Sequence, residues 1–267
     1  MSRNSQDRLG VQPEQTQPEK KINILDFVNP TEFVKLPSKG KTYDESHPLH
    51  NKESIEIKSM STMEIDLLTN QNLIEEGVVI QRLLDALIVD PDIKTDSLLP
   101  GDQNAIVVAA RISGFGPEYE VEVQCPNEKC RSKHSHVLDL REITHQDASI
   151  DAKDGIFEVR LPVSGLNAKC KLLNGGEYEQ LNKKLDQNQN SANFLKQVIV
   201  SIENETDRGI ISQFIDLMPA LDNKIVRKEY TKANPNMDFT ASVKCRKCKE
   251  VNRIQIPLSV NFFWSIT

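Results

Sequence analysis

The chain has 267 residues, of which 38% are hydrophobic and 27% are charged, and its formal net charge is −6 at pH 7. This length can bury two separate cores or the core of one pseudo-symmetric domain. The negative charge and the scattered lysines and arginines disfavour a general nucleic-acid binder, because phosphate contacts need concentrated basic side chains. No apolar run approaches the ~20 residues that span a membrane, and the first residues lack the apolar core of a signal peptide. We therefore expect a globular cytoplasmic protein, whose thiols stay reduced.

The first half of the chain predicts a polar tail followed by a strand and helices. Residues 1–21 are rich in Gln, Glu and Pro without periodicity, which predicts disorder, and order is expected from residues 22–28. A capping box, Ser61-Thr-Met-Glu64, marks the start of one helix, and the break Gly114-Phe-Gly-Pro117 ends the last. The predicted elements are a strand at 55–58 and helices at 61–68, at 78–89 and from about 102.

The second half repeats this alternation of strands and helices. Two strands are predicted around Pro162 and Gly165, and Asn234-Pro235 ends the last helix. The predicted elements are strands at 157–160 and 169–173 and helices at 177–185, 192–203, 210–217 and 221–231.

Four of the five cysteines form two short clusters, Cys125-Pro-Asn-Glu-Lys-Cys130 and Cys245-Arg-Lys-Cys248. Alternating residues flank both clusters, so each pair is predicted at the tip of a β-hairpin. Two such tips can meet around one tetrahedral Zn²⁺, with Cys125, Cys130, Cys245 and Cys248 as ligands at about 2.3 Å. Four thiolates leave no open coordination position, so the predicted cofactor is a structural zinc ion.

Other interpretations of the cysteines stay open. The basic residues inside Cys245-Arg-Lys-Cys248 favour the thiolate that binds metal. A disulfide is disfavoured in a reducing compartment, and a redox motif would need a βαβ context, but inert reduced thiols remain an alternative. His134 and His136 could replace a cysteine, although alternation past the turn more simply predicts strand residues with solvated rings. Cys170 is expected to be a small buried hydrophobe.

Two blocks of the sequence resemble each other. Glu32-Phe-Val-Lys-Leu-Pro-Ser-Lys-Gly40 matches Phe157-Glu-Val-Arg-Leu-Pro-Val-Ser-Gly165 in its basic residue, Leu, Pro and Gly, and a helical region and a cysteine hairpin follow each block. Lys58, Glu64 and Leu68 have counterparts in Lys171, Glu177 and Leu181. A chance match of Leu-Pro-x-x-Gly is the alternative to an internal duplication of roughly 120 residues.

The duplication defines the predicted fold class. We expect an α+β protein of two pseudo-repeated halves, residues 22–150 and 151–267, each built from helices and β-hairpins. Each half supplies one pair of cysteines, so that a zinc-ribbon-like site joins the halves.

No catalytic signature is present in the sequence. Gly40-Lys41-Thr42 has the last three residues of a phosphate-binding loop, but Lys35 stands where the first glycine belongs and Pro37 interrupts the loop. The G-x-S-x-G, HExxH and GxGxxG patterns do not occur. The sequence therefore predicts a protein that is not an enzyme.

The chain closes with its only tryptophan and two phenylalanines, Phe262-Phe263-Trp264. Aromatic side chains supply a large apolar area, so this segment either completes the protein's own core or anchors a partner. Because a chain without catalytic motifs must act through its surfaces, we predict these three residues as a partner-binding site.

Together these motifs resemble the baseplate hub assembly protein family of T-even-like tailed bacteriophages. The resemblance covers most of residues 30–267 and is carried by Leu36-Pro-Ser-Lys-Gly-Lys-x-Tyr43, Arg111-Ile-Ser-Gly-Phe-Gly116, both cysteine clusters, the second Leu-Pro-x-x-Gly and the closing aromatics. It implies a non-enzymatic part or assembly helper of a contractile-tail baseplate, bound to other hub or tail proteins. It places the chain in the cytoplasm of the infected bacterium during assembly, or in the tail baseplate of the virion. The zinc ion is inferred from the ligand spacing, not from the resemblance.

Two other function classes remain. A zinc-ribbon nucleic-acid-binding module would explain the cysteines and the nearby basic residues Lys244, Arg246, Lys247, Lys249 and Arg253, and salt-sensitive DNA binding would favour it. An enzyme would need a cleft with convergent, perturbed ionisable groups.

Overall fold

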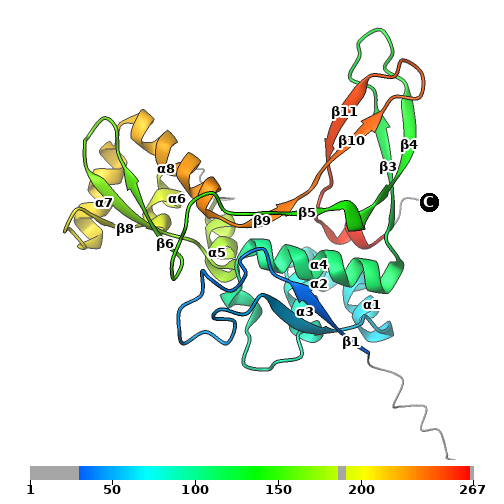
Figure 1. Cartoon of the computed structure of the whole chain (residues 1–267), viewed down its shortest axis with the longest axis horizontal. Coiled ribbons are helices and arrows are strands. Elements are labelled where there is room, and N and C mark those ends of the chain that lie inside the picture. The colour runs from blue at the N-terminus through cyan, green and yellow to red at the C-terminus, as the bar shows by residue number, and fades with distance from the viewer. Residues whose placement is uncertain (1–29, 186–190, 265–267) are drawn as a thin grey trace, which may run out of the picture.

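The computed structural model describes residues 30–185 and 191–264. The predicted tail of residues 1–21 and the predicted start of order at 22–28 lie outside this range. Within it, helices alternate with small antiparallel sheets, as the α+β prediction requires. Figure 1 shows two lobes, one around α4 and one around α8, with a pair of β-hairpins projecting beside the first lobe.

The first lobe packs short helices on a two-stranded sheet. Its sheet pairs β1 (Thr31–Lys35) with β2 (Ser54–Lys58). The predicted capping box is confirmed, because the backbone N–H of Ser61 donates to Glu64 Oε2 at 2.8 Å. The helices that follow are α1 (Thr62–Thr69), α2 (Gln71–Glu75), α3 (Val79–Leu87), the 3₁₀ turn η2 (Thr95–Ser97) and α4 (Pro100–Phe115). Gly116 ends α4 with a φ of 84°, a conformation that glycine adopts without strain.

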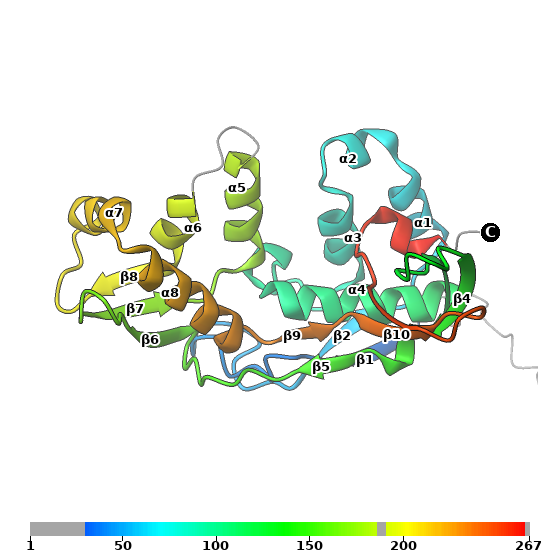
Figure 2. The same ribbon diagram turned by 90° about the horizontal axis from the view of Figure 1, so that it is seen from above.

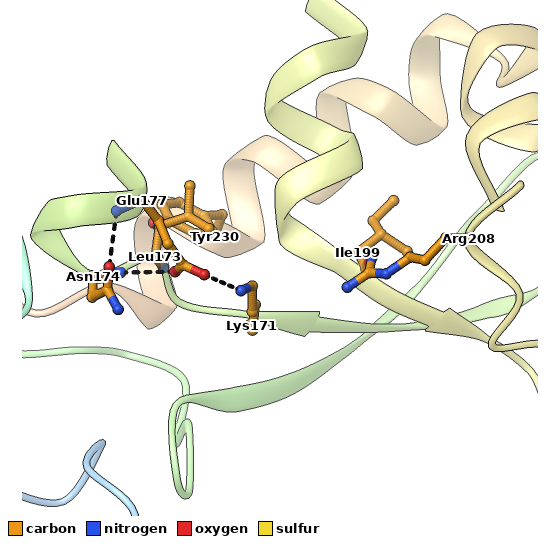
Figure 3. Close-up of polar contacts among 7 residues, drawn as sticks. All are labelled: Lys171, Leu173, Asn174, Glu177, Ile199, Arg208 and Tyr230. Carbon is orange, nitrogen blue, oxygen red and sulfur yellow. Dashed lines mark hydrogen bonds and ion pairs between the residues drawn. The ribbon is translucent and has the colours of Figure 1, made fainter. Parts of the chain in front are cut away.

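The second lobe is built around a three-stranded antiparallel sheet. It contains β6 (Ile156–Arg160), β7 (Asn167–Lys171), α5 (Gly175–Leu185), α6 (Ser191–Val198), β8 (Ile199–Ile202), α7 (Arg208–Leu217) and α8 (Ala220–Ala233). Asn174 and Glu177 bond reciprocally at the start of α5: Glu177 N donates to Asn174 Oδ1 at 2.9 Å, and Asn174 N donates to Glu177 Oε2 at 3.2 Å (Figure 3). Lys171 forms an ion pair with the same Glu177 side chain.

The predicted helix over residues 192–203 is wrong in its second half. The helix α6 ends at Val198, and residues 199–202 form β8, which pairs with β7. Three residues of the sequence Ile-Val-Ser-Ile are β-branched and favour a strand. Pairing with the edge of β7 outweighs the helical spacing of apolar residues on which the prediction rested. The guanidinium of Arg208 donates to the carbonyl of Ile199 at 2.8 Å and helps to hold this change of direction (Figure 3).

A buried aspartate anchors a loop in each lobe. Asp102, the third residue of α4, accepts bonds from Ser38 N at 3.0 Å, Ser38 Oγ at 2.6 Å and Tyr43 Oη at 2.6 Å. Asp222, the third residue of α8, accepts bonds from Val163 N at 2.8 Å and Ser164 N at 3.0 Å. Each carboxylate therefore holds one of the two Leu-Pro-x-x-Gly segments against a long helix.

Two hairpins follow the long helices. The first consists of β3 (Glu118–Gln124) and β4 (Lys133–Asp139), and the second of β10 (Thr240–Lys244) and β11 (Val251–Gln255). After the first hairpin and the short turn η3 (Leu140–Glu142), β5 (Thr144–Gln146) pairs with β9 (Asn236–Asp238), so this part of the chain runs along the edge between the lobes (Figure 2). After the second hairpin, η4 (Val260–Phe263) returns to α4 of the first lobe. The segment after each hairpin therefore contacts the other half of the chain: β5 pairs with β9, and η4 packs against α4.

Candidate metal centre

The four clustered cysteines meet where the two hairpin tips come together. Cys125 Sγ lies 3.5 Å from Cys248 Sγ, and Cys130 Sγ lies 3.8 Å from Cys245 Sγ. All four sulfur atoms lie within 4.8 Å of one another. Tetrahedral ligands at about 2.3 Å from a zinc ion would be separated by about 3.8 Å. Both short separations join one hairpin to the other, so the cluster is compatible with one metal ion shared between them.

Backbone hydrogen bonds shape each tip so that its two thiols point the same way. Cys125 N donates to Ser132 O at 2.9 Å, and Cys245 N donates to Glu250 O at 2.8 Å. The residue after the second cysteine of each pair has a left-handed backbone, with φ of 43° at Arg131 and 65° at Lys249. Both loops therefore turn back in a similar manner, although the first is two residues longer between its cysteines.

The environment of the thiols differs across the cluster. Cys125 and Cys245 are buried, and Cys248 is exposed. Burial raises the pKa of the Cys125 thiol to about 12. The backbone amide of Cys248, the hydroxyl of Ser132 and the amide of Lys247 lower the pKa of Cys245 to about 5, because they donate to its thiolate. A lowered pKa favours the thiolate, which is the form of cysteine that binds metal.

Two polar residues of the first hairpin support the cluster. Ser132 Oγ lies 3.0 Å from Cys130 Sγ and 3.4 Å from Cys245 Sγ. His134 Nε2 lies 2.9 Å from Ser132 Oγ and 3.5 Å from Cys245 Sγ. The sequence predicted a solvated ring for His134, but the half-buried ring contacts the cluster instead. The role of Ser132 was not predicted, since a serine two residues after a cysteine has no distinctive pattern.

Cys170 lies outside the cluster, as the sequence predicted. It belongs to β7 in the second lobe and is fully buried. Burial raises the pKa of its thiol to about 12, so the group stays neutral and acts as a small apolar side chain.

The closing aromatic residues pack on the first lobe. Phe262 and Phe263 are fully buried, and Trp264 is half-buried. The ring of Phe262 lies 5.4 Å from that of Tyr119, and the ring of Trp264 lies 5.3 Å from that of Phe115. This burial favours the alternative interpretation, in which the rings complete the protein's own core. The partner-binding role of Phe262, Phe263 and Trp264 stays a prediction.

A buried arginine fastens this segment, and sequence reasoning did not identify its role. Arg111 of α4 is 1% exposed and donates to the carbonyls of Phe262 at 3.1 Å, Gly116 at 2.6 Å and Glu118 at 3.0 Å. One side chain therefore connects α4, the start of the first hairpin and the segment after the second. The only sequence signal was the place of this arginine in Arg111-Ile-Ser-Gly-Phe-Gly116.

Comparison with protein-family models places the chain among known proteins. A family model described as T4 bacteriophage base plate protein matches residues 29–264. No curated protein and no solved structure matches the chain. Among the helices of residues 30–185 and 191–264, none has both the length and the apolar character needed to cross a membrane.

Proposed function

We propose that this chain, which belongs to the T4 bacteriophage base plate protein family, is a non-enzymatic baseplate hub protein or a factor that assembles the hub. The observation that carries the proposal is the family match, which spans all of the described residues. The family is structural, and the chain would act through contacts with other hub or tail proteins. Its place would be the host cytoplasm during assembly, and the tail baseplate if it is retained in the virion.

We further propose that Cys125, Cys130, Cys245 and Cys248 hold one structural zinc ion. The all-sulfur donor set and the separations near 3.8 Å support zinc, which binds four thiolates tetrahedrally. Such a site has no open position for a substrate, so the ion would act on the fold and not in a reaction. It would fix the two hairpins relative to each other, which suits a component of a large assembly.

Matching features of the two halves support an internal duplication. The reciprocal bonds of Asn174 and Glu177 at α5 correspond to those of Ser61 and Glu64 at α1. Asp102 and Asp222 hold equivalent loops, and the same number of residues separates each aspartate from the first cysteine of its hairpin. We infer two pseudo-repeated halves, residues 22–150 and 151–267, that place one cysteine pair each at a shared zinc-ribbon-like site.

Tagged chain recovered from infected cells tests the proposed function. Tail intermediates and finished virions are purified separately, the chain is quantified in each by mass spectrometry, and its density is sought by electron cryomicroscopy. Presence in both identifies a structural subunit, and presence in hub intermediates alone identifies an assembly factor. Absence from both, together with tails of normal structure when the gene is deleted, would reject the proposal.

A further inference from the structure

The tips of the two cysteine hairpins carry a concentrated positive charge on a negatively charged protein. Five cations of the two loops and Lys244 at the end of β10 are all exposed, and together they define what we call the basic tip: Lys129, Arg131, Lys244, Arg246, Lys247 and Lys249. Only Glu128 and Glu250 oppose them within the loops. In the part of the chain that the structure describes, none of the six forms an ion pair. Figure 1 shows both loops at the end of the projecting hairpins, away from the helices.

This charge exceeds what the metal centre needs. A zinc ion with four thiolates has a net charge of about −2, so two cations would balance it. Support of the thiolates therefore does not account for all six side chains.

The backbone gives a second, independent indication. Arg131 and Lys249 follow the second cysteine of their loops, and both have positive φ. Glycine adopts this conformation without steric cost, and a long side chain does not. Both loops nevertheless carry a long cationic side chain at this position, where the local backbone would favour glycine.

The surroundings of the basic tip define the kind of partner. Below the first loop, Lys133 of β4 is paired with Glu122 of β3, with Nζ and Oε1 3.8 Å apart, so the unpaired positive charge does not extend down this hairpin. A long phosphate backbone would extend past the basic tip onto this hairpin, where β3 and β4 offer it no unpaired cation, and the loops contain no aromatic residue on which a base could stack. A compact acidic patch on a folded protein would contact the tip alone, with complementary charge.

We propose that the basic tip docks onto an acidic surface of a neighbouring protein subunit, with Arg131 and Lys249 as contact residues. The inference rests on the proposed metal centre for the placement of the two loops, and on the baseplate family for a protein as the partner. The tip brings equivalent cations from the two halves of the chain to one surface, which neither half could present by itself.

The test measures binding of the full zinc-loaded chain to a short synthetic peptide rich in aspartate and glutamate, and to a DNA duplex of matched charge. Wild-type chain is expected to bind the peptide more tightly than the duplex, and more weakly as salt rises. Arg131→Gly combined with Lys249→Gly should weaken peptide binding by roughly twofold to thirtyfold, as the loss of two surface ion pairs would. Lys39→Gly is the matched control, because Lys39 is also a cationic residue with a left-handed backbone (φ 52°) but lies in the first lobe, away from the basic tip. This control should bind the peptide like wild type.

Melting and zinc content are measured for every variant. Glycine adopts the left-handed backbone without strain, which favours the folded chain, but it also raises the conformational entropy of the unfolded chain. Because these two effects oppose each other, the melting temperature of the double glycine variant should be close to that of wild type. Arg131→Gln with Lys249→Gln removes the charge without changing the backbone and replaces the glycine pair if that pair unfolds. Unchanged peptide binding in the folded charge-removal variant would overturn the proposal, as would tighter binding of DNA than of peptide. A chain that contains no zinc rejects the metal centre, whereas a zinc-loaded chain that binds no peptide rejects the docking surface alone.

Discussion

Asp102 and Asp222 occupy the same position in their helices, the third residue of α4 and of α8, and each accepts a backbone hydrogen bond from a Leu-Pro-x-x-Gly segment. A carboxylate in the first turn of a helix is stabilised by the helix dipole. The surroundings nevertheless differ. Tyr43 and the Ser38 hydroxyl also donate to Asp102, whereas two backbone amides hold Asp222.

The pH dependence of these two aspartates is expected to have opposite sign. Burial outweighs the hydrogen bonds at Asp102 and raises its pKa, so the stability linked to this group is present at low pH and is lost as pH rises through the raised pKa. Burial also raises the pKa of Asp222, but the amides of Val163 and Ser164 outweigh it and lower the pKa below its ordinary value. The stability that Asp222 contributes is therefore present above the ordinary pKa of an aspartate and is lost as pH falls through the lowered pKa of the folded state.

Asp222→Asn should destabilise the protein by about 1–3 kcal/mol at neutral pH, because one of the two backbone amides loses its acceptor and the other keeps only a neutral one. Urea unfolding measured from neutral to acid pH should show this loss shrinking as the wild-type carboxylate becomes protonated. Asp66→Asn, at an exposed position of α1, is the control and should stay within about 0.5 kcal/mol of wild type. An equal effect of both substitutions would contradict the anchoring role of Asp222.

Cys248→Ser should lower the stability of the whole molecule and remove bound zinc, because metal binding is coupled to folding when no site exists in the unfolded chain. Purified wild-type protein should contain close to one zinc per chain, and a chelator should lower its melting temperature toward that of the variant. Cys170→Ser, the matched control, should keep its zinc and lose about 1–3 kcal/mol from burying an unpaired hydroxyl. Identical melting shifts of the two variants, with and without chelator, would argue against a metal centre.

Arg111→Met should destabilise the protein by roughly 3 kcal/mol or more, because up to three buried carbonyls lose their donor. Methionine keeps an apolar side chain of similar length but lacks the guanidinium, whose carbon lies 5.5 Å from the centre of the Phe115 ring, so the loss reports on the hydrogen bonds and the cation–π contact of that group. Hydrogen exchange should rise in η4 and at the start of β3 before it rises in the second lobe. Uniform exchange across both lobes would show that Arg111 does not connect these segments specifically.

The residues that were predictable from sequence are those whose function depends on local spacing. The cysteine clusters, the capping box at Ser61 and the paired strands around Pro162 follow from short-range patterns, and the structure contains all of them. Features that depend on distant partners were not predictable. The end of α6 is set by the edge of β7, and the burial of Phe262 depends on Arg111 and Tyr119 in the other half of the chain. No local pattern distinguishes an aromatic segment that returns to its own core from one that binds a partner.

The closing segment is expected to stabilise the first lobe. Phe262→Ala should cost about 3–5 kcal/mol, because a fully buried ring leaves a cavity beside Tyr119. Leu217→Ala is the control, since that side chain is 85% exposed and its loss should cost less than about 0.5 kcal/mol.

A chain that ends at Ser259 removes the whole segment and separates its two predicted roles. We expect this truncated chain to lose cooperative unfolding, because the carbonyl that Arg111 binds and both buried rings are removed together. If the truncated chain instead stays folded and no longer co-purifies with hub proteins, the segment is a partner-binding site. If it stays folded and binds them normally, neither role is correct.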